Sequence, residues 1–170
     1  DSNRLLSATF ELSLDLLQEQ LGVDSNRLLP AFHALGHGPS SSFGASLGAN
    51  LAGLRAADFE ELTVSAHTLS LLERMPGTPE ELRWRLHPLL AEWLRSRTDE
   101  ATEAAVSARM ADWFIARLPE EGKTGQEQDQ DRRWQEIRQE EVAFRTWLAQ
   151  PRVKRALIKN TGVIMKKKIF

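Results

Sequence analysis

The segment from residue 82 to residue 94 changes its hydrophobic period partway along, and this change constrains the fold more than any other feature. Apolar residues alternate with arginines over 82–86 and then recur at helical spacing over 89–94. The sequence therefore predicts a strand that runs directly into a helix, with His87 at the junction. The first turn of a helix carries unpaired backbone N–H groups, and such a corner suits a phosphate. The apolar positions are Leu82, Trp84, Leu86, Leu89, Leu90, Trp93 and Leu94.

Apolar periodicity predicts four helices before this segment, over about 7–21, 28–35, 47–54 and 58–69. Gly22 is a plausible C-cap for the first helix, and Asp24-Ser25 offers a cap for the second. Pro30 fits only in a first turn, so the second helix is expected to be short or to start late. Asp58 is expected to cap the fourth helix.

Residues 71–74 and 82–86 are strand candidates on either side of the turn-rich stretch 75–81, and residues 36–44 are predicted to be a loop. Three helices followed by a hairpin is the order of a winged helix. After His87, a longer helix capped by Asp99 should reach Leu118, and a further one should cover 134–148. Residues 119–131 contain no large apolar residue and are expected to form a flexible, solvated linker.

The predicted fold is thus mainly α, a winged-helix-like bundle with one small β-hairpin followed by further helices. A chain of 170 residues suggests one or two small domains. We expect a winged-helix-like domain over 1–97, a helical arm over 98–150 that includes the linker 119–131, and a basic, unstructured tail over 151–170. Because the first residue is Asp and not Met, the chain is expected to be a fragment of a longer protein.

Composition and charge narrow the class of protein. The chain has no cysteine, no apolar run near 18 residues and no signal peptide, so a cytoplasmic protein without a membrane span is expected. Of the 22 basic residues, seven lie in 151–170, which has no acidic residue. Residues 1–150 therefore contain 15 basic and 24 acidic residues and are net negative. A body this acidic is a poor general nucleic-acid binder.

The strand, histidine and helix over 83–94 resemble the winged-helix segment of bacterial STAND signalling ATPases and their NB-ARC relatives. Pro88 follows the histidine here, as in many bacterial members, whereas Gly36-His-Gly-Pro39 departs from the usual end of the second helix. Weaker similarity to the same region of the family covers 10–17, 28–35, 70–72, 108–114 and 134–148.

The resemblance implies a non-catalytic regulatory module that couples the ADP or ATP state of a larger protein to a rearrangement of its domains. His87 would be the residue that contacts the nucleotide. ADP or ATP is implied for the full-length parent and no cofactor for this fragment. The implied partners are the parent's own nucleotide-binding domain and its repeat or sensor domain. No GxxxxGK[ST] loop occurs in the sequence, so the fragment is not expected to hydrolyse ATP.

Two catalytic or metal interpretations receive less support. Gly44-Ala-Ser46-Leu-Gly48 matches the G-x-S-x-G nucleophile elbow, with Asp58 and His67 or His87 following in order, but the chain lacks the βαβ alternation of a hydrolase. His33 and His37 have a metal-compatible spacing on a helix, yet glycines surround His37 and no third ligand lies nearby in the sequence. No catalytic or metal-binding residue is therefore assigned.

A DNA-binding winged helix is the main alternative function. Its recognition helix would be the predicted helix 58–69, which carries three acidic residues and no Lys or Arg. That charge disfavours DNA, although Arg74, Arg83 and Arg85 would form a basic stripe on the wing. The five tryptophans occur at core spacing and are expected to be packing anchors. The basic tail could contact anionic lipid or nucleic acid, but an unstructured terminus is the preferred interpretation.

Overall fold

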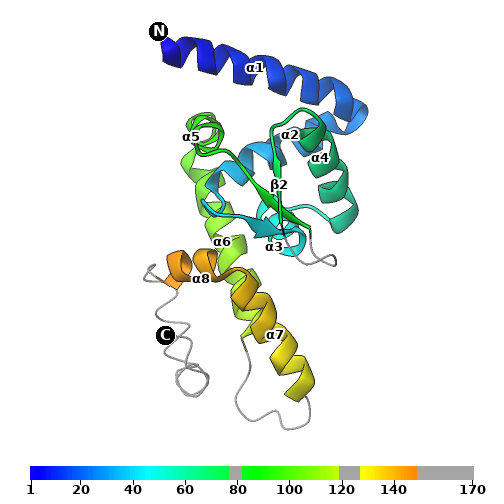
Figure 1. The fold of residues 1–170 in the computed structure, drawn as a ribbon, viewed down its shortest axis with the longest axis vertical. Coiled ribbons are helices and arrows are strands. Elements are labelled where there is room, and N and C mark those ends of the chain that lie inside the picture. Colours follow the sequence, from blue (N-terminus) through cyan, green and yellow to red (C-terminus); the bar gives the residue numbers. More distant parts are fainter. Residues whose placement is uncertain (77–81, 119–126, 149–170) are drawn as a thin grey trace. The chain divides into compact units, whose positions relative to one another are not determined.

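The computed structural model describes residues 1–76, 82–118 and 127–148 (Figure 1). These residues form two compact units, 1–109 and 110–170, and the division falls within one helix. The predicted turn residues 77–81, the linker residues 119–126 and the tail 151–170 lie outside the described residues. The structure is mainly helical with a small antiparallel sheet, which confirms the predicted fold class.

The first unit begins with four helices and two short 3-10 turns. They are α1 (Ser2–Leu21), η1 (Gly22–Asp24), α2 (Ser25–Ala34), η2 (Leu35–His37), α3 (Ala45–Ala52) and α4 (Ala56–Thr68). Gly22 ends α1 with a positive φ of 59°, as predicted. Gly53 ends α3 in the left-handed helical region, with φ 69° and ψ 31°.

Three strands complete the sheet: β1 (Phe43–Gly44), β2 (Glu73–Met75) and β3 (Arg83–Arg85). They lie in the order β1-β3-β2, all antiparallel, with Phe43 opposite Trp84 and Arg74 opposite Trp84 on the other side. The predicted hairpin is present. The predicted loop 36–44 is partly wrong, because Phe43 is fully buried and adds a strand beside β3. The resulting order of helices and strands is that of a winged helix.

The remaining helices are α5 (Pro88–Ser96), α6 (Glu100–Arg117), α7 (Glu127–Gln139) and α8 (Glu141–Leu148). Asp99 caps α6 as predicted, since its Oδ1 accepts hydrogen bonds from the backbone N–H and the hydroxyl of Thr102 at 2.9 and 2.8 Å. The single helix expected over 134–148 is instead broken at Glu140. The expected linker is too long by five residues, because α7 already begins at Glu127.

Two further local predictions are wrong. Helix α2 starts at Ser25 and continues through Pro30, although proline removes one backbone donor from the ladder. Burial of Leu28 and Phe32 on both sides of the proline outweighs that loss. Asp58 does not cap α4, which begins two residues earlier at Ala56, and its carboxylate instead forms ion pairs with arginines.

The core of the first unit sits between α2, α3, α4 and the sheet. Its largest fully buried side chains are Phe32, Phe43, Phe59, Leu17, Leu28, Leu35, Leu47, Leu51, Leu62 and Leu72. In the second unit Phe114 packs edge-on against Trp113 and lies 5.2 Å from Phe144 between ring centroids. None of the described helices combines the length and the apolar character needed to span a membrane.

Candidate functional site

His87 stands at the junction that the sequence predicts, between the end of β3 and the first residue of α5. It is the N-cap of α5, with an extended backbone (φ −60°, ψ 136°), and Pro88 occupies the first helical position. Its Nδ1 accepts a hydrogen bond from the backbone N–H of Leu89 at 3.2 Å. The imidazole therefore satisfies one of the donors that a helix N-terminus leaves open.

This hydrogen bond decides which nitrogen of the ring can act on a partner. Because Nδ1 accepts, the proton of the neutral ring is on Nε2. The His87 side chain is exposed, and no described residue accepts a hydrogen bond from its Nε2–H. The corner thus presents one N–H donor to the surface beside the positive end of the α5 dipole.

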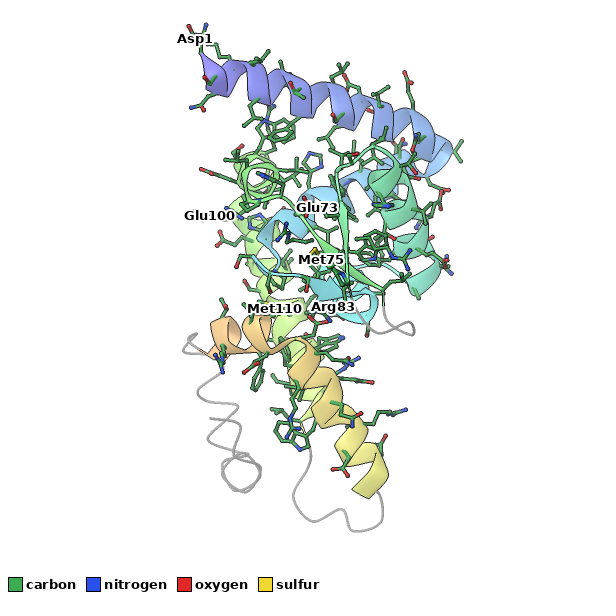
Figure 2. All side chains as sticks on the ribbon, viewed as in Figure 1. Asp1, Glu73, Met75, Arg83, Glu100 and Met110 are labelled. Carbon is green, nitrogen blue, oxygen red and sulfur yellow. The ribbon has the colours of Figure 1, made fainter. Side chains whose placement is uncertain are left out.

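The two arginines of β3 form hydrogen bonds with neighbouring residues and do not add a free cationic group to the site at His87. Arg83 donates to the hydroxyl and the carbonyl oxygen of Ser42 at 3.1 and 3.0 Å. Arg85 donates to Glu73 across the hairpin at 2.6 and 3.1 Å. Figure 2 shows Glu73 and Arg83 on the adjacent strands. Of the wing's three predicted basic residues, only exposed Arg74 has a side chain with no hydrogen bond or ion pair within the described chain.

Helix α4 occupies the position of a recognition helix, and its exposed face is acidic. Glu60 and Glu61 are exposed, as is Val64 with 56% of its surface accessible. Asp58 points inward, where Arg27 on α2 holds it at 2.6 Å. That hydrogen bond keeps the pKa of the Asp58 carboxyl below its ordinary value. An exposed face with two carboxylates and no cation would repel a phosphate backbone.

The residues proposed for a serine hydrolase are engaged elsewhere. Ser46 lies in the first turn of α3, after the two-residue strand β1. Asp58 is bound by Arg27. The Nδ1 of His67 lies 3.0 Å from the carbonyl oxygen of Leu72, and its ring packs edge-on against Trp84. With His87 capping α5, no described hydrogen bond links these histidines to Asp58 as a triad requires.

His33 and His37 turn to different partners and do not converge. His33 Nδ1 lies 2.9 Å from the carbonyl oxygen of Leu29, whereas His37 Nε2 lies 2.5 Å from the hydroxyl of Thr98. Within the described ranges, no three His, Asp or Glu residues are grouped closely enough to hold a metal ion. Partial burial lowers the pKa of His37, partly offset by the charge of Glu103.

One contact near the site had no signal in the sequence. The 3-10 turn η2 packs directly on the second half of α5, where a Cβ at Gly36 would lie 2.8 Å from the Cβ of Leu94. Arg95 donates to the carbonyl oxygen of Gly36 at 2.9 Å, and the His37–Thr98 contact joins η2 to the short segment between α5 and α6. The partners are about sixty residues apart, so local patterns could not pair them.

The tryptophans are packing residues wherever their side chains are described. Trp84, Trp113 and Trp134 are buried. Trp93 lies 5.6 Å from Phe10 between ring centroids, and its Nε1 donates to the hydroxyl of Ser7 at 2.9 Å. The side chain of Trp147 lies outside the described residues.

Comparison of the chain with protein-family models, with characterised proteins and with solved structures finds no match.

Proposed function

We propose that this chain is a non-catalytic regulatory module of a STAND-type signalling ATPase, in which His87 contacts a phosphate of ADP held by a neighbouring domain. The observation that carries the proposal is the orientation of the His87 ring. Its Nδ1 is occupied by the cap of α5, and its Nε2–H is exposed at the helix N-terminus. A donor fixed in this way, next to a helix dipole, suits an anionic phosphate oxygen.

A single charge-assisted hydrogen bond of this kind is worth about 1.5–3 kcal/mol. Each 1.4 kcal/mol is a factor of ten in an equilibrium constant, so one such bond biases a two-state switch by about tenfold or more. While ADP is bound, the contact between His87 and its phosphate would hold the parent protein in its closed, inactive state. Exchange of the nucleotide or loss of this contact would allow the parent protein to open.

Helix α5 provides the route from this contact to the rest of the unit. Its N-terminal end carries His87, and its C-terminal end is held to η2 through Gly36 and Arg95. After α5 the chain turns into α6, and His37 of η2 contacts Thr98 in the short segment between the two helices. A displacement of α5 would therefore be passed to η2 and to the start of α6.

The decisive experiment separates the cap from the phosphate contact, in a protein that carries this module together with its ATPase core. His87→Ser keeps a good N-cap but removes the Nε2–H donor. We expect His87→Ser to fold normally and to release bound ADP about tenfold faster or more than the wild type. His87→Ala should release ADP equally fast. Unchanged ADP retention in both variants would show that His87 only caps α5.

DNA binding is the second candidate, and the order of helices and strands favours it while the charge of α4 opposes it. It predicts that the chain shifts a DNA duplex at low salt and loses the shift as salt rises. Arg74→Ala would weaken that shift, because Arg74 is the wing cation whose side chain has no described hydrogen bond or ion pair. Absence of any shift at low salt excludes this function.

A further inference from the structure

Helix α1 has two apolar faces, and only one of them is used by the unit. Leu14, Leu17 and Leu21 are buried in the core. Leu5, Leu12 and Leu16 remain 72%, 63% and 44% exposed. At 3.6 residues per turn these three fall within about 40° of arc, on the side of the helix away from the core. We name this exposed row the leucine seam; α1 lies along the outer edge of its unit (Figure 1).

The spacing of the seam is that of a helix-to-helix contact. Leu5 and Leu12 are seven residues apart, and Leu12 and Leu16 are four apart, with Thr9 between the first two. Apolar residues at alternating steps of three and four pack against a similar row on a second helix. A row of three exposed leucines over three turns is more than the scattered apolar residues of an ordinary surface.

The charges beside the seam are confined to one edge. Arg4, Asp15 and Glu19 lie along that edge, and all three are exposed. Within the described chain none of them has an ion pair. The opposite edge carries uncharged Ser2 and Ser13. The charged edge carries Arg4 near the start of α1 and the carboxylates of Asp15 and Glu19 near its end.

This pattern is complementary to itself in one orientation only. In an antiparallel pair related by a two-fold axis, the charged edge of one helix faces the charged edge of the other. Leu5 then faces Leu16 of the second helix, and Leu12 faces Thr9. In the same register Arg4 lies between Asp15 and Glu19 of the second helix. A parallel pair would place the charged edge against the uncharged one.

We propose that the leucine seam is a self-association surface, on which α1 of a second copy of this chain packs antiparallel to form a two-fold symmetric dimer. Apolar burial of the leucines supplies the attraction. The two symmetric sets of Arg4 contacts with Asp15 and Glu19 select the antiparallel orientation. The surface is independent of the His87 corner and of the function proposed for it.

The oligomeric state of the whole chain tests the seam directly. Analytical ultracentrifugation over a range of concentrations should show a mass about twice that of the monomer at the upper end. Leu12→Glu should raise the dissociation constant by about tenfold or more, because it puts a charge in the middle of the seam. Val64→Glu makes the same change at an exposed residue of α4 and should leave the constant unchanged. A chain that stays monomeric at every concentration overturns the proposal.

The orientation is tested by charge reversal and by disulfide formation. Arg4→Glu should weaken the dimer, and adding Asp15→Lys and Glu19→Lys should restore it. The chain has no cysteine, so Leu5→Cys and Leu16→Cys can be made singly and mixed. Antiparallel packing predicts that the mixture forms a disulfide between the two variants. Disulfides between like variants, formed at least as readily, would overturn the antiparallel arrangement.

Discussion

The two ends of α5 are held very differently. At the C-terminal end Leu94 is fully buried, Arg95 binds the carbonyl of Gly36, and η2 packs without room for a Cβ. At the N-terminal end Leu89 is 48% exposed, and the His87 cap is a single hydrogen bond at the surface. One helix thus has an anchored end and an open end. We therefore expect that His87 can be replaced at little cost to the fold, whereas a change in the packing of α5 on η2 is costly.

The largest effect is expected at the anchored end. In Gly36→Ala the new Cβ would lie 2.8 Å from the Cβ of Leu94 and 3.0 Å from the carbonyl oxygen of Ala91, so α5 or η2 must move. We expect the free energy of unfolding to fall by about 1–3 kcal/mol, as for other overpacked sites. Urea unfolding followed by tryptophan fluorescence measures it. Ser40→Ala, at an exposed residue nearby, is the control. If Gly36→Ala lowers the free energy of unfolding no more than Ser40→Ala does, the C-terminal end of α5 is not tightly anchored.

A smaller effect is expected at the open end. His87→Ala removes the cap of α5 and should lower the free energy of unfolding by about 0.5–1 kcal/mol. His87→Ser restores a cap, so its stability should lie within a few tenths of the wild type. The same urea titration applies to both variants. If His87→Ala lowers the free energy of unfolding as much as Gly36→Ala does, the N-terminal end of α5 is not the more tolerant of the two ends.

The smallest effect concerns pH and again involves the anchored end. Partial burial lowers the pKa of His37 below its ordinary value of 6.5, despite the opposing charge of Glu103. The unfolded chain then binds a proton more readily than the folded one as the pH drops below 6.5. Stability should be highest above that pH and decline below it. His37→Gln should flatten this part of the pH profile, measured by thermal unfolding between about pH 5 and 8. An identical profile in both proteins would rule out this contribution.

Prediction from sequence succeeded where one short segment contains the whole signal. The change of period at 82–94 places a strand, His87 and a helix in the correct order, and the caps at Gly22 and Asp99 are local features that the structure confirms. Prediction failed where tertiary packing overrides a local preference. Pro30 lies inside α2 because Leu28 and Phe32 on both sides of it are buried.

The strand β1 and the inward position of Asp58 show the same limit. Phe43 sits in a stretch rich in Ser, Gly and Pro, and it becomes a strand only because β3 passes beside it. Asp58 has the sequence position of a cap, but Arg27 on another helix determines where its carboxylate points. Both outcomes depend on residues distant in the sequence.

Local sequence patterns are sufficient to predict the mainly helical fold with a small hairpin and the position of His87 at a helix start. Those features follow from periodicity and from capping, which act over a few residues. Three other features arise only from tertiary packing: His87 is exposed with its Nδ1 engaged by α5, η2 anchors the far end of α5, and a row of leucines on α1 stays outside the core. These features depend on which surfaces meet after folding. A helix with two apolar faces does not reveal from its own sequence which face will be buried.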